Sequence, residues 1–343
     1  MHIQRTVWEG WSEAEGFGGN DKLFTIIVVY IGYKTIKPYI CETMAKIWYS
    51  ILIALIRPWQ YLPLGFHYFW GRFLSWMMKV ARYRKDVVLI NLSRSFPELK
   101  YKEIRKIARQ FYRNLGMIAA ETLWLGGRVR RKEKVFKKDI VQVENGSEIY
   151  DAIGKSSVMI LNSHAGNWEL IGAYMQKLCD ESADKISEKD VAVVYRRLHS
   201  KFSEEFFRRN RCALQAKDFE GYVESRVVMR YMVRHRKENK IYVFPNDQYP
   251  YGTAIARSTV DFLNQKTEVM VGGAEVAERM GMSVFYMNAD RTAKGRYTVR
   301  FSKICDNAAE LGTEAIIKEY YRHLEEDIRK NPSNYLWSHK RWK

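Results

Sequence analysis

Apolar residues follow two periods along most of the chain, one typical of buried strands and one typical of amphipathic helices. Short apolar runs predict strands at 157–161, 191–195, 240–245, 283–288 and 297–301. Apolar residues at helical spacing predict helices at 104–115, near 169–179, 201–211, 222–236 and 268–280, and at 317–328 before Asn331-Pro332. This alternation predicts an α/β domain with a mostly parallel central sheet flanked by helices. In such sheets, ligands bind beyond the carboxyl ends of the strands.

The first eighty residues show a different pattern. The apolar stretches 23–33 and 47–56 are each shorter than the ~20 residues that span a bilayer. The second stretch continues to Trp70 with Arg57 as its one formal charge, and its two prolines favour a bent element in the membrane interface. Tryptophan is the residue type found at headgroup depth, and it recurs here at Trp48, Trp59, Trp70 and Trp76. We therefore predict a membrane-associating helical segment at 44–80, with a buried helical hairpin as the alternative.

The charge balance restricts the partners. The 343 residues include 57 Lys+Arg and 39 Asp+Glu, a formal net charge of +18, which implies an anionic partner. No nucleic-acid-binding module is visible, so we expect no nucleic acid. Basic runs at 128–138, 196–201 and 234–237 fit an acidic carrier protein or a phosphorylated lipid, although solvated helix and loop faces explain each run equally well.

The four cysteines, Cys41, Cys179, Cys212 and Cys305, are scattered and have no histidine at metal-ligand spacing. We therefore predict neither a zinc site nor a disulfide framework. The polar N-terminus has no signal-peptide pattern, so we expect the domain to face the cytoplasm.

The stretch 157–170 carries the most informative candidate site. His164 follows a buried-type strand, and Glu169 comes five residues later, which on one continuous helix places the two side chains about 140° apart. If Gly166 turns the chain and Asn167 caps the next helix, Glu169 lies in its first turn and can reach back to His164. A carboxylate placed there fixes the imidazole tautomer, as a general base for an alcohol requires. A capped helix beside an incidental histidine is the alternative.

Further candidates follow other predicted strands. Arg196 is placed to stabilise an oxyanion or to bind a lipid phosphate, and an ordinary solvated arginine is the alternative. Asp247 and Gln248 follow the strand at 240–245 and are expected at the same edge of the sheet, where they shape the site or pair with arginines. Together with Asn167, these residues are our predicted substrate-binding set.

The box N-S-H-A-G-N-W-E around His164 and Glu169 resembles the H-x4-D/E signature of the lysophospholipid acyltransferase superfamily, specifically its lipid A late acyltransferase (lauroyl/myristoyl acyltransferase) family. Other boxes of that family follow in its order. They are R-Y-R-K-D-V-V at 82–88, S-F-P-E at 95–98, F-Y-R-N-L-G at 111–116 with Glu121, V-Y-R at 194–196, Asp247-Gln248 and the closing Y-L-W-S-H-K-R-W-K. The resemblance covers about residues 44–343. It departs from the family at 262–267, where many members carry F-F-G.

The resemblance implies transfer of a fatty acyl group from an acyl carrier protein thioester to a hydroxyl of a lipid A precursor, in lipopolysaccharide biosynthesis at the cytoplasmic face of the inner membrane. His164 is then the general base, assisted by Glu169, without a metal or other cofactor. The implied organisation is an extension at 1–43, a membrane-associating segment at 44–80 and a catalytic domain at 81–343. Two alternatives are an acyltransferase of the same family with a glycolipid, aminolipid or pigment acceptor, and a catalytically silent membrane-bound protein in which His164 and Glu169 lie far apart.

Overall fold

The computed structural model describes residues 51, 54–56, 58–126, 140–198, 200–212, 214–216, 218–250 and 258–342, with the backbone alone at 201 and 202. Residues 59–343 form one compact unit, which holds every element discussed below, and residues 1–58 form another. The predictions for the extension at 1–43, for the first residues of the membrane-associating segment and for the basic run at 128–138 lie outside the described residues.

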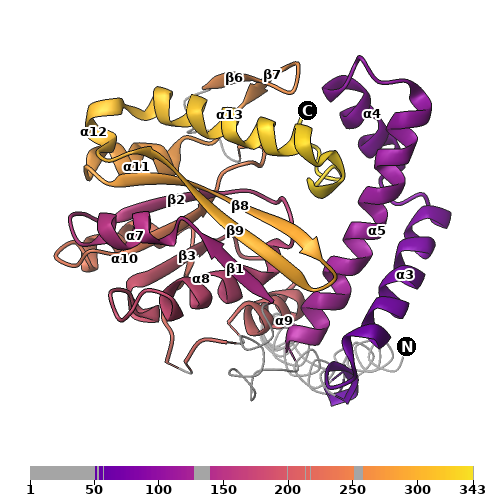
Figure 1. Ribbon diagram of the computed structural model, residues 1–343, viewed down its shortest axis with the longest axis horizontal. Helices are drawn as coiled ribbons and strands as arrows, with labels where there is room; N and C mark the ends of the chain where they lie inside the picture. The colour runs from indigo at the N-terminus through magenta and orange to yellow at the C-terminus, as the bar shows by residue number, and fades with distance from the viewer. Residues whose placement is uncertain are drawn as a thin grey trace, which may run out of the picture. The chain divides into compact units, whose positions relative to one another are not determined.

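Within the described ranges, seven strands form one sheet in the order β1-β9-β8-β2-β5-β3-β4 (Figure 1). Every neighbouring pair is parallel except β8 and β9, which are antiparallel, so the predicted α/β class with a mostly parallel sheet is confirmed. The strands are β1 (Val141–Glu144), β2 (Val158–Asn162), β3 (Val191–Tyr195), β4 (Tyr222–Glu224), β5 (Ile241–Pro245), β8 (Ser283–Ala293) and β9 (Arg296–Cys305). A separate antiparallel hairpin pairs β6 (Thr259–Phe262) with β7 (Gln265–Glu268).

The core lies on both faces of the sheet, because the central strand β2 is buried along its whole length. Met159 and Leu161 belong to one hydrophobic cluster, and Val158 and Ile160 belong to the other. Figure 1 shows α11 and α13 on one side of the sheet and α8 on the other. The helices of this unit are α3 (Leu64–Val80), α4 (Lys85–Ser95), α5 (Tyr101–Gly126), α7 (Gly146–Ile153), α8 (Ile171–Asp180), α9 (Lys201–Arg211), α10 (Val228–Arg234), α11 (Gly272–Arg279), α12 (Ala308–Leu311) and α13 (Thr313–Lys330). Short 3₁₀ turns lie at η3 (Trp168–Leu170), η4 (Glu188–Asp190) and η5 (Pro332–Asn334).

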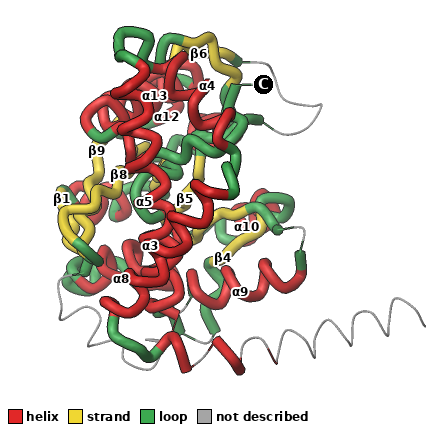
Figure 2. The backbone as a smooth tube through the Cα atoms, turned by 90° about the vertical axis from the view of Figure 1, so that its right-hand side faces the viewer, coloured by secondary structure: helices red, strands yellow, loops and turns green. Residues whose placement is uncertain are grey.

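Helices α3 and α5 pack side by side (Figure 2). Two glycines allow their backbones to approach closely. A Cβ atom on Gly71 would lie 2.5 Å from the carbonyl oxygen of Gly116, and a Cβ atom on Gly116 would lie 2.2 Å from the carbonyl oxygen of Gly71. Larger residues at either position would therefore force the helices apart.

The outer face of α3 has the opposite composition from that of an ordinary surface helix. Its buried residues are small or polar: His67, Tyr68, Gly71 and Ser75. Its exposed residues are large and apolar: Phe69, Trp70, Phe73, Trp76 and Met77. No helix in the described part of the chain is both long and apolar enough to cross a membrane.

Most predicted elements agree with the structure, and two helix predictions were wrong at their starts. The helix predicted at 222–236 begins only at Val228, because Tyr222–Glu224 form the edge strand β4 beside β3. Gly221 permits this pairing, since a Cβ atom there would lie 2.1 Å from the carbonyl oxygen of Val191. Likewise, the helix predicted at 268–280 is confined to α11, because Glu268 ends strand β7.

Candidate active site

The loop after β2 has the turn and the cap that the sequence predicts. Gly166 adopts a positive φ of 67°, and a Cβ atom there would lie 2.1 Å from the carbonyl oxygen of Ala289. Asn167 caps the turn η3, because its side-chain oxygen accepts a hydrogen bond of 3.2 Å from the backbone N–H of Glu169. Glu169 therefore lies in the first turn of the helical segment, as expected.

His164 is paired with Asp247 at the carboxyl edge of the sheet. Strands β2 and β5 are neighbours, so the segments that follow them meet. Nδ1 of His164 lies 2.7 Å from Oδ1 of Asp247, and the backbone N–H of His164 donates to Oδ2 at 3.0 Å. The side chain of His164 is 19% exposed and that of Asp247 is 2% exposed. The carboxylate is thus enclosed, while the imidazole can be reached from solvent.

The hydrogen bonds of Asp247 define the tautomer of His164. Burial alone raises the pKa of the Asp247 carboxyl, but the charge of His164 and the hydrogen bonds from its ring and backbone lower that pKa below its ordinary value overall. An ionised carboxylate only accepts hydrogen bonds, so Nδ1 of His164 is the donor, and in the neutral imidazole Nε2 carries the lone pair. The side-chain nitrogen of Gln248 lies 3.1 Å from Nε2. The basic nitrogen of the ring is therefore the one turned away from Asp247.

Glu169 is engaged elsewhere. Nε and Nη2 of Arg211 donate to its two carboxylate oxygens at 2.8 Å each, and Nε1 of Trp168 donates to Oε1 at 3.0 Å. The structure does not bring Glu169 into hydrogen-bonding contact with His164. The indirect link is Trp168, whose ring centroid lies 5.5 Å from that of His164. Burial lowers the pKa of the Arg211 guanidinium, but the charge and hydrogen bonds of Glu169 raise that pKa by more. The net shift is upward, so the guanidinium stays charged.

The remaining predicted residues separate into buried and exposed groups. Asn167 is fully buried, and its side-chain nitrogen donates to Glu121 at 2.9 Å. Arg196 is exposed just beyond the end of β3. Asp247 and Gln248 lie against His164, as described above. The sequence therefore placed Asp247 and Gln248 at the correct edge of the sheet, while the contact between Asp247 and His164 is new.

The C-terminal segment also reaches this site. A bridge joins Ala165 to Tyr335, and the hydroxyl of Tyr335 donates to the carbonyl of Asp247 at 3.4 Å. His339 lies in the electrostatic range of both Asp247 and His164. Burial is the main cause that lowers the pKa of His339 to about 4, against the opposing effect of Asp247. Sequence reasoning identified this segment only as a box of the resemblance, because nothing local indicates which loop it contacts.

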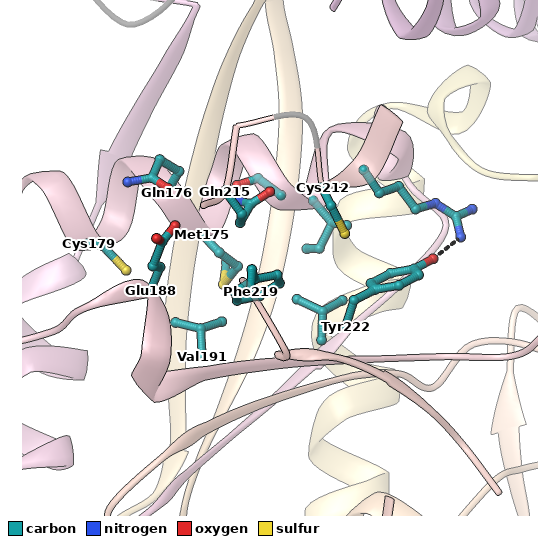
Figure 3. Close-up of a pocket in the computed structure, with 13 residues that line it drawn as sticks. Met175, Gln176, Cys179, Glu188, Val191, Cys212, Gln215, Phe219 and Tyr222 are labelled. Carbon is teal, nitrogen blue, oxygen red and sulfur yellow. Dashed lines mark hydrogen bonds between the residues drawn. The ribbon is translucent and has the colours of Figure 1, made fainter. Parts of the chain in front are cut away.

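A pocket lies between α8, β3 and the segment after α9 (Figure 3). Figure 3 shows Met175, Val191 and Phe219 lining it together with polar side chains. Arg211 also lines it and donates a hydrogen bond of 2.6 Å to the hydroxyl of Tyr222. The pocket thus shares Arg211 with the Glu169 ion pair, whereas neither His164 nor Asp247 lines it.

Among the described side chains, no group of three or more His, Cys, Asp or Glu is placed to hold a metal ion. The arrangement instead offers a histidine with one oriented, reachable nitrogen, which is suited to proton transfer. A comparison with curated proteins finds no match. The family model for bacterial lipid A biosynthesis acyltransferases matches residues 41–343, which is most of the chain. The protein therefore belongs to the bacterial lipid A biosynthesis acyltransferase family and is an acyltransferase.

Proposed function

We propose that this protein transfers a fatty acyl group from acyl carrier protein to a hydroxyl of a lipid A precursor, with His164 as the general base. The observation that carries the proposal is the pairing of His164 with Asp247, which leaves Nε2 as the basic nitrogen on a partly exposed ring. A general base for an alcohol needs this combination of a fixed tautomer and an accessible lone pair. The silent alternative expects His164 and Glu169 to lie apart, and no hydrogen bond joins them, but Asp247 supplies the carboxylate partner that the imidazole of a general base requires.

The reaction requires one proton carrier. Nε2 of His164 accepts the proton of the acceptor hydroxyl while the hydroxyl oxygen bonds to the thioester carbonyl carbon. Asp247 holds Nδ1 and stabilises the imidazolium that forms. The carbon–sulfur bond then breaks, and the leaving thiolate takes the proton back from Nε2. In the absence of substrate, the amide of Gln248 occupies the hydrogen-bonding position of the hydroxyl.

In this proposal Glu169 assists His164 indirectly, through a neighbouring side chain. Its carboxylate holds Trp168 and Arg211, and Trp168 packs against the imidazole of His164. Arg196 and Gln248 are proposed to contact the substrate, because both lie beyond strand ends at the carboxyl edge of the sheet. Asn167 acts on the loop and not on the substrate, since it is fully buried.

The charge distribution supports the two macromolecular partners that we propose. Arg234, Arg236 and Lys237 are exposed on one short segment, which suits an acidic carrier protein. The phosphate groups of a lipid A precursor are a second anionic ligand for a chain of net charge +18.

The outer face of α3 is our proposed contact with the cytoplasmic leaflet of the inner membrane. Exposed Trp70, Phe73 and Trp76 form an aromatic stripe, whereas the face of α3 that packs on α5 is small or polar. Such an arrangement is unfavourable in water and favourable at headgroup depth. Exposed Arg82 and Lys85 follow the helix and suit anionic lipid headgroups.

Membrane retention tests this contact. We expect the full-length protein to stay in the membrane fraction after a high-salt wash, because salt screens surface charge but does not weaken burial of apolar surface. Removing residues 1–43 should not release it, since the family match begins at residue 41 and leaves out all but the last three residues of that extension. Replacing Trp70, Phe73 and Trp76 together by serine should increase release. Release of the unmodified protein by salt alone would assign the attachment to basic residues.

Product analysis tests the reaction. Membranes that contain the protein are incubated with acyl carrier protein thioesters of several chain lengths and a tetra-acylated lipid A precursor, and the products are identified by mass spectrometry. We expect a mass increase of one acyl group on the lipid, with none in the His164→Ala variant. Parallel incubations with glycolipid and aminolipid acceptors separate the same-family alternative, which predicts acylation of those lipids only.

A further inference from the structure

Glu121 is a buried carboxylate with several hydrogen-bond donors that the mechanism above does not use. It lies on α5, and its side chain is 3% exposed. Its Oε1 accepts a hydrogen bond of 2.6 Å from the hydroxyl of Tyr68 on α3. Its Oε2 accepts from Asn167 and from Nη2 of Arg291, both at 2.9 Å, and from the hydroxyl of Tyr297. One carboxylate therefore joins α3, α5, the His164 loop and the β8–β9 hairpin.

The protonation states in this cluster are well defined. Burial, followed by the charge of Glu121, raises the pKa values of Tyr68 and Tyr297 far above the ordinary range, so both remain neutral donors. Burial lowers the pKa of Arg291, but Tyr297 and Glu121 raise it overall, so Arg291 stays charged. A buried carboxylate is favourable only with such partners. Glu121 is therefore an acceptor in every contact that it makes here.

The contact with Asn167 is the one that reaches the proposed active site. Nδ2 of Asn167 donates to Glu121, and Oδ1 of the same amide accepts from the backbone N–H of Glu169. Rotating the amide by 180° would place its NH₂ group against an N–H donor and its oxygen against a carboxylate. Glu121 thus fixes the orientation of the amide that begins η3, three residues after His164.

The opposite side of the loop is held independently. Asp247 accepts from the backbone N–H of His164, and the carbonyl of Asn334 accepts from the N–H of Gly166 at 3.0 Å. The position of His164 is therefore determined between two anchors, Asp247 on one side and Asn167 with Glu121 on the other. Loss of either anchor allows the imidazole to move relative to the substrate.

We infer that Glu121 is a positioning residue, which holds His164 in register with Asp247 by fixing Asn167. The inference rests on the proposed role of His164 as general base. Glu121 does not touch the substrate, since it is enclosed by protein. A misplacement of about 1 Å at a catalytic group lowers rate by about 10²-fold, so the effect belongs in kcat and not in KM.

The experiment is a double-mutant cycle with Glu121→Gln and Asn167→Ser, measured as kcat and KM for acyl transfer. Serine retains the helix cap but cannot reach Glu121. Asn167→Ser therefore breaks the same link while it leaves the ion pair of Glu121 with Arg291 intact, and it remains informative if Glu121→Gln fails to fold. We expect each single variant to lower kcat about 10- to 100-fold with KM within about threefold. The double variant should be no slower than the worse single variant, because both break one link.

Tyr68→Phe is the matched control, because it removes a hydrogen bond from the same carboxylate without touching Asn167. We expect its kcat to stay within about threefold of the parent. Multiplicative effects in the cycle, or a kcat within threefold for both Asn167→Ser and Glu121→Gln, would overturn the inference.

A crystal structure of Asn167→Ser keeps this inference separate from the proposed reaction. We expect the distance between His164 Nδ1 and Asp247 Oδ1 to lengthen beyond hydrogen-bonding range even if no acyl transfer is found for the parent protein. An unchanged His164–Asp247 pair in that structure would remove the positioning role, whatever the activity. Conversely, full activity of His164→Ala would reject the proposed reaction, and the His164–Asp247 distance in Asn167→Ser would still decide whether Glu121 positions His164.

Discussion

Two carboxylates flank the loop after β2, and each pairs with one basic side chain. Their burial is similar, because the His164–Asp247 pair has exposed side-chain fractions of 19% and 2%, and the Arg211–Glu169 pair has 18% and 9%. The two pairs differ in how many hydrogen bonds their polar atoms already make. Glu169 accepts from Arg211 twice and from Trp168, and the third guanidinium nitrogen binds Tyr222. Nε2 of His164 instead faces the side-chain amide of Gln248 at 3.1 Å.

This comparison teaches that exposure alone does not distinguish a reactive pair from a structural one. The guanidinium of Arg211 cannot give up a proton at physiological pH, since Glu169 raises its already high pKa. The imidazole of His164 instead offers a ring nitrogen that can accept a proton from the substrate and return it. We therefore expect loss of the His164 pair to affect rate, and loss of the Arg211 pair to affect mainly stability.

The largest expected effect is that of His164→Ala, which removes the proton acceptor. Turnover should fall roughly 10²–10⁴-fold, with folding and membrane association retained. His235→Ala is a matched control, because His235 also pairs with a carboxylate, Glu238 at 3.1 Å, but on an exposed helix end. Activity of His164→Ala within about threefold of the parent would remove His164 from the mechanism and with it the contrast between the two pairs.

Asp247→Asn should have the next largest effect. The side-chain NH₂ of asparagine donates to Nδ1, which forces the proton of His164 onto Nε2 and leaves no lone pair for the acceptor hydroxyl. We expect kcat to fall about 10²–10³-fold with little change in KM, measured by steady-state kinetics with saturating thioester. A rise in KM alone would assign Asp247 to substrate contact, as the sequence first suggested.

Glu169→Gln should affect rate less than Asp247→Asn, because Glu169 reaches His164 only through Trp168. We expect kcat to fall by about tenfold or less, and the free energy of unfolding to fall by about 3 kcal/mol, since Arg211 loses its counter-charge at a largely buried position. Kinetics and denaturant unfolding on the same preparation check both quantities. A loss of turnover equal to that of Asp247→Asn would show that Glu169 acts on the imidazole directly and would abolish the distinction between the pairs.

Local sequence was sufficient for the loop and insufficient for its partners. The positive φ of Gly166 and the cap of Asn167 depend on a few adjacent residues, and both were predicted. The partner of His164 is 83 residues away and the partner of Glu169 is 42 residues away. The first contact depends on β2 lying beside β5, and the second depends on α9 packing against η3. Apolar periodicity encodes neither arrangement. The sequence therefore favoured the carboxylate nearest along the chain.

The fold shows the same limit. Buried strands such as β3 were predicted from composition, and strand β3 was placed at the observed residues. Edge strand β4 was predicted as helix, because its three residues form a strand only through pairing with β3. The network of Glu121 could not be predicted either, since Tyr68, Asn167 and Tyr297 come from distant parts of the chain.

The smallest expected effect concerns His339, a second histidine near Asp247. Burial lowers its folded pKa to about 4, whereas an unfolded histidine titrates near 6.5. Between these pH values the unfolded chain binds more protons than the folded protein, so the free energy of unfolding should fall as pH decreases from about 6.5 to about 4. Above pH 6.5 the contribution is constant, because the residue is neutral in both states.

His339→Gln tests this point and sharpens the comparison. The neutral side chain should flatten the pH dependence of unfolding between about pH 6.5 and 4, measured by denaturant titration in steps of pH. The physical reason connects to the active site: a neutral His339 adds no second positive charge beside the carboxylate that His164 binds. An unchanged slope in His339→Gln would mean that burial does not lower the pKa of His339 in the folded protein.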